Sequence, residues 1–470
     1  MKNNVMKHSN GTIIAFGMAV LSCFAAILIP LVGSVEKYSW LFLLPLWFCL
    51  ISVIFHRIYG LVGVSITASL LIALMFLKNV ITPLFMSFGD GYFVAAVDTS
   101  ATMLPAILLE IYEVTAVFTV LYLKMPKLKH HISQAITEPL YARKDKVKYF
   151  SIVVLLLLGI AATCLLLYPQ LLSYITVGMS SDRSTIIQQA RAKILMKETT
   201  PTFVYYAYTL SVNILRWVIP ASVMFRLYIS KRRETTKIVW SFLAIGVSTI
   251  MMTDTVAVSV YIAVSYALLM CRMYPLQKKK ILMFSIITVG VGSAMLLLVK
   301  TFGSGADVAL GEIAYMLQAY FSGPENVAVA LAINTPTSLS EVGGDIFKFI
   351  PYLMYFFKDL PSSNVIFNQT YWGSSDIITQ IIPMISQGAR HFTFVLAPIY
   401  TVLISVIAVN WETKATYKGY LFDYAVSAIA CVCLSMSVAM YSASLCLQTY
   451  LNYILPIQII LWMVRKTSVR

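Results

Sequence analysis

The side chains best suited to bind or transform an anionic substrate are four arginines and one histidine. They are Arg183, Arg191, Arg216, Arg390 and His391. Guanidinium binds phosphate oxygens through two parallel hydrogen bonds and stays charged, and imidazole exchanges a proton near neutral pH. Ser181 and Asp182 are good N-cap residues and predict a helix that carries Arg183 and Arg191. Eight residues of spacing put these two arginines about 80° and two turns apart, so they could hold one anion together. Contact with lipid headgroups is the alternative role for each arginine.

Three ionisable residues lie inside strongly apolar segments. Glu110 and Glu113 are one helical turn apart and so share a helix face, and Arg216 lies in the sequence NILRWVIP. Burying such a group in hydrocarbon costs at least about 2.5 to 3.5 kcal/mol, so these residues should face each other or a wet cavity. Two interpretations stay open, a structural ion pair that joins two helices and a cavity in which Arg216 meets a substrate phosphate.

A proton acceptor for chemistry could be His391 or Glu325. His391 follows Arg390 at the start of an apolar segment, and Glu325 follows a helix-breaking Gly-Pro pair. A structural role is the alternative for His391. The other acids nearby, Glu312, Asp345 and Asp376, rank behind these two, because acids on loops are more often solvated than catalytic.

The elements that must position these residues are membrane-spanning helices. The chain has 470 residues, of which 59% are apolar and only 12% charged, a composition typical of an all-α polytopic membrane protein. Apolar runs long enough to cross a bilayer predict about 12 spans in one transmembrane domain, 1–470. The expected spans are 12–34, 39–55, 60–79, 102–123, 150–168, 203–227, 238–253, 255–271, 281–300, 393–409, 420–441 and 448–464.

Most of the 35 Lys and Arg residues fall on alternate loops and near the two termini. This asymmetry predicts that both termini are cytoplasmic, and it explains the net charge of +15 without a nucleic-acid partner. The topology leaves two long segments on the opposite side of the membrane, 173–202 and 303–392, and His391 is the single histidine expected there. The seven cysteines have no spacing typical of a zinc site, and neither a metal nor a cofactor is predicted.

The segment 303–392 is about ninety residues long, rich in aromatic residues, and lies between two apolar helices. Its apolar runs, 349–357 and 377–385, are shorter than the roughly 20 residues of a membrane span, and each contains a proline. We expect them to lie at the membrane interface or to dip in and return. A loop of this length is usually functional or disordered, and its aromatic content argues against disorder.

This arrangement resembles the Wzy-type polymerases that join oligosaccharide repeat units of bacterial surface polysaccharides. Residues 363–403, SNVIFNQTYWGSSDIITQIIPMISQGARHFTFVLAPIYTVL, are similar to the end of that family's large loop and the helix behind it. Residues 314–327, AYMLQAYFSGPENV, are similar to another part of that loop. The resemblance implies a multi-pass enzyme of the bacterial cytoplasmic membrane that transfers a growing glycan from polyprenyl pyrophosphate onto a new lipid-linked repeat unit, without a metal. Besides this lipid-linked oligosaccharide, the implied partners are membrane lipids and the flippase and chain-length regulator of the same pathway.

For that reaction the resemblance assigns roles to the residues singled out above. The arginines would stabilise the pyrophosphate leaving group, and His391 or Glu325 would accept the proton of the attacking hydroxyl. Aromatic rings would stack on sugar faces, and amides would bond sugar hydroxyls. These residues are Tyr315, Tyr320, Tyr371, Trp372, Gln318, Asn326 and Asn368. An aromatic belt at the interface is the competing explanation for the rings. Two other functions stay open, a lipid-linked oligosaccharide flippase or other polysaccharide transporter, and a ligase or acyltransferase of similar topology.

Overall fold

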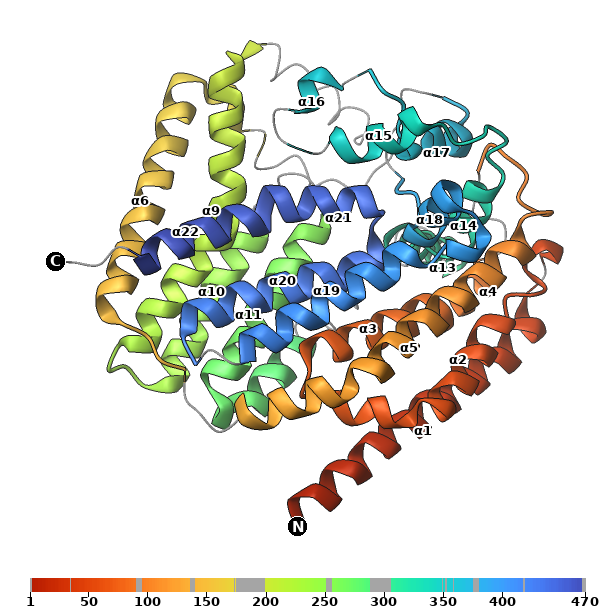
Figure 1. Ribbon diagram of the computed structural model, residues 1–470, viewed down its shortest axis with the longest axis horizontal. Helices are drawn as coiled ribbons and strands as arrows, with labels where there is room; N and C mark the ends of the chain where they lie inside the picture. Colours follow the sequence, from red (N-terminus) through yellow and green to blue (C-terminus); the bar gives the residue numbers. More distant parts are fainter. Residues whose placement is uncertain are drawn as a thin grey trace. The chain divides into compact units, whose positions relative to one another are not determined.

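The computed structural model shows an all-α polytopic membrane protein (Figure 1). It describes residues 2–33, 35–89, 95–135, 140–172, 174, 199–250, 256–287, 306–348, 350, 353–357, 359–374, 380–416 and 419–466. Within these ranges the only β-type pairing is an isolated bridge between Tyr141 and Tyr420. The chain forms two compact units. Unit 1 is Met1–Gln134, Thr288–Lys414 and Cys431–Gln448, and unit 2 is Ala135–Ile287, Ala415–Ala430 and Thr449–Arg470.

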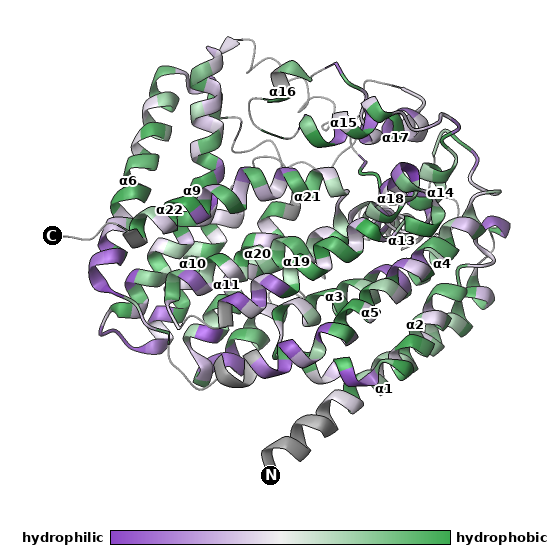
Figure 2. Ribbon diagram, viewed as in Figure 1, coloured by the Kyte–Doolittle hydropathy of each residue, from purple (hydrophilic) through white to green (hydrophobic). Residues whose placement is uncertain are grey.

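Nine helical stretches of the described chain are long and apolar enough to cross a membrane, and one bent pair could form a tenth span. Figure 2 shows their apolar character along most of their length. The nine are Gly11–Val32, Glu36–Ile54, Ile66–Phe88, Met103–His130, Lys144–Leu167, Thr202–Ile229, Phe394–Lys414, Leu421–Met440 and Ala443–Val464. The bent pair is Val258–Met273 with Pro275–Ile287. The expected span 281–300 lies largely outside the described residues.

The third span differs most from its prediction, because it runs from Ile66 to Phe88 where the sequence predicts 60–79. Its helix begins after Ser65, whose side chain accepts a hydrogen bond from the Ala68 amide. It continues past Lys78 through a π-helical turn, η3 (Leu77–Ile81). Lys78 does not end the helix, because its ammonium group is paired with the buried Glu113 of a neighbouring helix.

Unit 1 contains several membrane-spanning helices as well as the short helices of segment 303–392. Its helices are α1 (Lys2–Val32), α2 (Leu43–Ile54), α3 (Ile66–Phe76), α4 (Thr82–Phe88), α5 (Met103–Ala135), α13 (Ala306–Tyr320), α14 (Pro324–Leu331), α15 (Leu339–Phe347), α16 (Leu353–Phe356), α17 (Ser363–Trp372), α18 (Met384–Phe392), α19 (Ile399–Thr416) and α21 (Ala443–Thr449). The helix α20 (Leu421–Met440) begins in unit 2 and ends in unit 1.

The short helices α13, α14 and α18 are part of the main hydrophobic core of unit 1. Ala314, Val327 and Ile385 pack there with buried residues of α1, α2, α4 and α5. The approach of α4 to α13 is close at Gly89, where a Cβ atom would lie 3.1 Å from the Cα atom of Gly311. This packing shows that part of segment 303–392 is built into the helical core.

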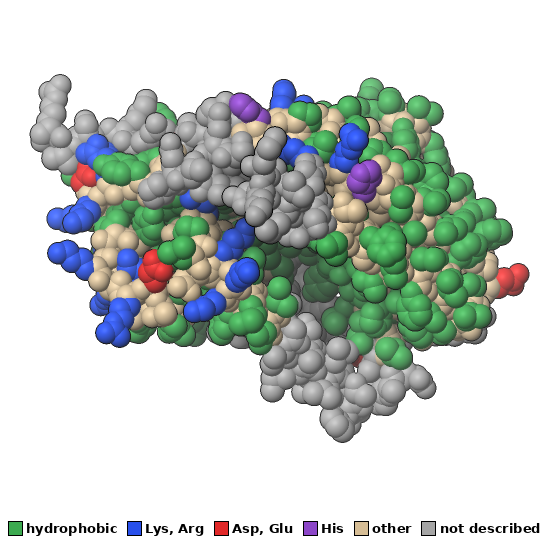
Figure 3. Space-filling view, turned by 90° about the horizontal axis from the view of Figure 1, so that it is seen from below, with side chains coloured by type: hydrophobic (Ala, Val, Ile, Leu, Met, Phe, Trp, Pro, Cys, Tyr) green, Lys and Arg blue, Asp and Glu red, His purple; other side chains and the backbone are tan. Residues whose placement is uncertain are grey.

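Unit 2 is a helical bundle with one strongly basic end. Its helices are α6 (Lys144–Leu167), α9 (Thr202–Ile229), α10 (Glu234–Ile250), α11 (Val256–Met273) and α22 (Leu455–Lys466). The helix α9 packs against α6, α10 and α11. Exposed cations lie where α6 and α10 begin and beyond the end of α11, and Figure 3 shows Lys and Arg side chains gathered on this face. They include Arg143, Lys144, Lys148, Lys231, Arg232, Arg233, Lys279 and Lys280.

Candidate functional site

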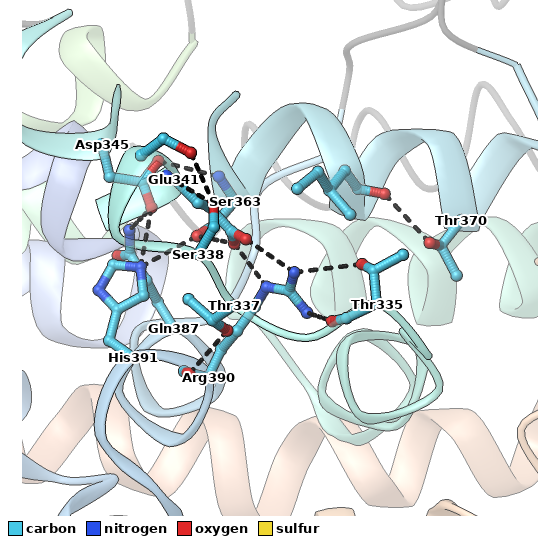
Figure 4. Close-up of polar contacts among 12 residues, drawn as sticks. Thr335, Thr337, Ser338, Glu341, Asp345, Ser363, Thr370, Gln387, Arg390 and His391 are labelled. Carbon is cyan, nitrogen blue, oxygen red and sulfur yellow. Dashed lines mark hydrogen bonds and ion pairs between the residues drawn. The ribbon is translucent and has the colours of Figure 1, made fainter. Parts of the chain in front are cut away.

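The strongest concentration of buried polar side chains in segment 303–392 lies where α15, α17 and α18 meet, and we call it the α18 cluster. It consists of Glu341, Asp345, Ser363, Gln387, Arg390 and His391 (Figure 4). The helix α15 begins at Leu339 with the hydroxyl of Ser338 as its cap, accepting from the Glu341 amide. Two carboxylates, four residues apart on α15, thereby face α17 and α18.

Two glycines allow the helices of the α18 cluster to come this close. A Cβ atom on Gly344 would lie 1.9 Å from the carbonyl oxygen of Pro361, just before α17. A Cβ atom on Gly388 would lie 2.0 Å from the carbonyl oxygen of Ala397, just before α19. Only glycine fits such contacts. Gly344 directly precedes Asp345, and Gly388 lies two residues before Arg390.

Arg390 forms a bidentate ion pair with Glu341. Its Nε and Nη2 atoms donate to the two carboxylate oxygens at 2.5 and 2.8 Å. The side chains are only 8% and 2% exposed, so the pair is largely removed from water. The other edge of the guanidinium group donates to the carbonyl and hydroxyl oxygens of Thr335 at 3.1 and 3.3 Å. The cation predicted to bind phosphate is therefore held by a carboxylate in this structure, with its second edge on a loop backbone.

His391 pairs with Asp345 in the same way. Its Nε2 atom lies 3.1 Å from Asp345 Oδ2 and 3.1 Å from Ser363 Oγ, and its Nδ1 atom lies 2.8 Å from the Tyr400 hydroxyl. The imidazole and the carboxylate are 1% and 3% exposed. Asp345 is thus a buried partner of His391, and the expectation that it is a solvated loop acid is wrong.

Gln387 connects the α18 cluster to the turn between α20 and α21. Its amide nitrogen donates to Asp345 Oδ2 at 2.9 Å and to Ser444 Oγ at 2.5 Å, and its amide oxygen accepts from the Ala443 backbone at 2.8 Å. The Ser363 backbone amide donates to the other Asp345 oxygen at 3.0 Å. The cluster thus joins two carboxyl groups, one guanidinium group and one imidazole in a single hydrogen-bonded network.

Glu325 lies in a separate polar cluster at the start of α14. Its carboxylate accepts from Lys37 Nζ at 3.0 Å, the Tyr38 hydroxyl at 3.0 Å and the Thr99 hydroxyl at 2.7 Å. The residue is fully buried. These three donors, which come from two other segments of unit 1, hold the Glu325 side chain in place and so anchor the N-terminus of α14.

The other residues predicted to bind sugar serve mainly to fold segment 303–392. The Gln318 amide donates to the Gly323 carbonyl at 2.9 Å, and Asn326 donates to the Gln318 carbonyl at 3.4 Å, so both amides brace the turn between α13 and α14. The Tyr315 hydroxyl accepts from Gln380 at 2.7 Å. Tyr320 is 39% exposed and is the most accessible of the four.

Asn368, Tyr371 and Trp372 lie on α17. The Asn368 amide bonds both the backbone N–H and the carbonyl of Gln380, at 2.9 and 2.7 Å. Tyr371 is 1% exposed and packs with Phe367 in a second hydrophobic cluster of unit 1, against which Trp372 also packs. These contacts of the three residues lie within segment 303–392 and its neighbouring hydrophobic cluster.

The expected site also included three arginines outside unit 1. Arg183 and Arg191 lie outside the described residues. Arg216 lies on α9 in unit 2, where it is fully buried and its Nη2 atom donates to Ser259 of α11 at 2.7 Å. Arg390 and His391 thus share the α18 cluster of unit 1. Arg216 is instead a buried residue of unit 2 that is bonded to Ser259.

Lys78 is the ionic partner of Glu110 and Glu113, for which the sequence left open a pairing with Arg216 or a position facing a cavity. Lys78 Nζ lies 2.6 Å from Glu113 Oε2 and 3.7 Å from Glu110 Oε1, and all three side chains are at most 1% exposed. The hydroxyl of Thr401 on α19 donates to Glu113 Oε1 at 2.8 Å. The sequence does not indicate Lys78 as this partner, because a lysine after a long apolar run is typical of the end of a span.

Among the described residues, no group of three or more His, Cys, Asp and Glu side chains is arranged to hold a metal ion. Comparison of the chain with protein-family models, with curated proteins and with solved structures finds no match. The site therefore has to be interpreted from its own geometry.

Proposed function

We propose that the protein joins polyprenyl-pyrophosphate-linked oligosaccharide repeat units at the outer face of a bacterial cytoplasmic membrane. It would transfer the growing glycan as one block onto the next lipid-linked unit. The observation that carries this proposal is the α18 cluster itself. It places an arginine and a histidine with their carboxylate partners at the end of a large folded segment, directly before the spanning helix α19.

The polymerase reaction breaks the bond between the anomeric carbon and the pyrophosphate oxygen and forms a bond from that carbon to an acceptor hydroxyl oxygen. The bonding electrons leave with the pyrophosphate, so a fixed cation lowers the barrier. Phosphate oxygens would replace Thr335 at the outer edge of the Arg390 guanidinium group, while Glu341 keeps the guanidinium plane oriented.

The proton of the attacking hydroxyl would pass to the Asp345–His391 pair. A carboxylate beside Nε2 stabilises the imidazolium that forms when the ring accepts a proton. With Nε2 facing Asp345, the ring nitrogen that accepts the proton is Nδ1. Because the His391 side chain is only 1% exposed, the sugar reaches Nδ1 only after the contact with the Tyr400 hydroxyl opens. Binding of the pyrophosphate at Arg390 would supply the free energy for that opening.

The charge pattern supports the orientation that we propose. Exposed lysines and arginines gather at one end of the unit 2 bundle, around the N-termini of α6 and α10. Cytoplasmic loops carry an excess of such residues, which favours a cytoplasmic location for this end and for both termini. By the order of the spans in the sequence, segment 303–392 would then face the other side.

The test is analysis of surface polymer and lipid-linked intermediates. A deletion strain should accumulate a single lipid-linked repeat unit on the outer leaflet and lose long polymer. Arg390→Ala should reduce the product to single repeats when the product is normalised to the amount of folded protein in the membrane, and Arg390→Lys should give shortened chains because lysine keeps the charge but not the fork. Arg232→Ala, an exposed cation of unit 2, is the control and should leave chain length unchanged. Normal chain length in Arg390→Ala would overturn the proposal.

A flippase or another transporter is the second candidate, and the Lys78–Glu110–Glu113 cluster favours it. Buried acids and bases within spanning helices often mark ion pathways. In that case the deletion strain would retain the repeat unit on the inner leaflet, and substitution of Glu110 or Glu113 would affect function more than substitution of Arg390.

A further inference from the structure

We propose that Glu110, with Lys78 and Glu113, forms a buried proton-binding site in the spanning part of unit 1, in which Glu110 carries the proton. The inference does not depend on the proposed function. Its basis is the number of charges in the cluster and the hydrogen bonds that each carboxylate makes.

Glu113 has the contacts of an ionised carboxylate. One of its oxygens lies 2.6 Å from Lys78 Nζ, and the other accepts from the Thr401 hydroxyl at 2.8 Å. Both oxygens therefore have a donor, and the ammonium group supplies the compensating charge.

Glu110 is different, although it is on the same face of α5 one turn earlier. Neither of its oxygens has a hydrogen-bond donor, and the nearest cation, Lys78 Nζ, is 3.7 Å away. The residue is fully buried. An ionised carboxylate in such surroundings carries a large desolvation penalty, and a group in this position takes up a proton instead.

The charge count leads to the same result. The cluster contains two carboxyl groups and one ammonium group, so with both carboxylates ionised it would carry a net negative charge in the core. The turn η3, which carries Lys78, is continuous with α3 and α4 and packs against α1 and α2. The helix α5 supplies the two acids, and α19 supplies Thr401. The described side chains of α1 and α2 include no Asp, Glu, Lys, Arg or His, so a proton on Glu110 is what balances the cluster.

Two features separate this site from an ordinary buried acid. Lys78 lies in the π-helical turn η3, and such turns occur often at functional sites because they widen the helix locally. The second feature is the lack of donors at Glu110, which a comparison with Glu412 on α19 makes clear. It is also buried, but it accepts from Ser65 Oγ at 2.8 Å and from the backbone amides of Ile66 and Thr67 at 2.6 and 3.0 Å. Those donors at the start of α3 stabilise a negative charge, and Glu110 has no such set.

Infrared spectroscopy of the reconstituted full-length protein tests the inference, because a protonated carboxyl group has its own C=O stretching band. Relative to the unmodified protein at neutral pH, Glu110→Gln should lose one carboxyl equivalent. Glu113→Gln should also lose one, since Lys78 then pairs with an ionised Glu110. Lys78→Met should gain one, because both acids are then protonated.

The set keeps the proposal testable if one variant does not fold, since each folded variant gives its own predicted change. Glu412→Gln is the matched control and should leave the bands of the Glu110 cluster unchanged. If the infrared spectrum of the Glu110→Gln variant is identical to that of the unmodified protein, Glu110 is ionised and the proposal is overturned. A Lys78→Met variant with no additional carboxyl band would overturn it as well.

Discussion

Ser363 Oγ and Asp345 Oδ2 both lie 3.1 Å from the same ring nitrogen of His391, Nε2. In a nucleophilic triad the acid bonds one imidazole nitrogen and the serine bonds the other, so that the ring can pass a proton between them. Here the other nitrogen, Nδ1, contacts the Tyr400 hydroxyl. Ser363 is therefore not arranged as an activated nucleophile, and its hydroxyl instead donates to Glu341 at 2.8 Å.

From this arrangement we expect Ser363→Ala to keep activity and to form no less product per folded molecule than the unmodified protein. The loss of one hydrogen bond to the Glu341 carboxylate should lower the free energy of unfolding by about 1 to 3 kcal/mol. Polymer length and thermal unfolding in detergent provide the two measurements. Complete loss of activity in a well-folded variant would show that the hydroxyl takes part in the chemistry.

The ion pair between Arg390 and Glu341 should show strong coupling in a double-mutant cycle. Either single alanine substitution leaves one largely buried charge without its partner and should cost about 3 to 5 kcal/mol. The double substitution should cost clearly less than the sum of the two, because no unpaired charge remains. Unfolding measurements on the four proteins give the coupling free energy, and additive costs would mean that the pair contributes no interaction.

Gly344 and Gly343 are adjacent on α15 and provide a test with a built-in control. At Gly344 a Cβ atom would lie 1.9 Å from the Pro361 carbonyl oxygen, whereas at Gly343 the nearest atom is 3.6 Å away, on the Leu360 side chain. Gly344→Ala should therefore separate α15 from α17, with a cost of about 1 to 3 kcal/mol and reduced activity. Gly343→Ala should be neutral or stabilising by up to about 1 kcal/mol, because alanine is the better helix former. Equal unfolding temperatures for the two variants would contradict the close packing.

Glu325 should behave as a structural clamp. Glu325→Ala leaves the hydroxyls of Tyr38 and Thr99 without their acceptor and should cost about 2 to 5 kcal/mol, whereas Glu325→Gln keeps one oxygen acceptor and should cost less. Activity per folded molecule should be preserved in Glu325→Gln. An inactive but stable Glu325→Gln protein would instead restore Glu325 as the proton acceptor.

The sequence predicts the class of fold well because bilayer thickness imposes long apolar runs, which are visible without any structure. It also singles out Arg390 and His391, because arginines are few, and His391 is the one histidine, in the segments expected on the side opposite the cytoplasm. Their partners were not predictable, since Glu341 and Asp345 lie 49 and 46 residues away from them in the chain, and α15 reaches α18 only through the tertiary fold.

Lys78 shows a second limit of prediction from sequence. A lysine after an apolar run usually marks the end of a span, and the same residue continues one when acids of another helix compensate its charge. That compensation depends on Glu110 and Glu113 lying opposite in space, which hydropathy does not describe. The same reasoning applies to Asn368, which resembles a sugar-binding amide in sequence but folds the backbone at Gln380.

The amide of Gln387 has consequences for how segment 303–392 can move. It donates to Asp345 and Ser444 and accepts from Ala443, so the side chain cannot rotate without breaking bonds at both of its ends. A ligand that displaced α18 would also have to displace the α20–α21 turn or break these hydrogen bonds. The Asp345–His391 pair is thus tied to the start of α21. Gln387→Ala would remove this tie and leave α18 held by its packing in the core of unit 1 and by the close contact between Gly388 and Ala397.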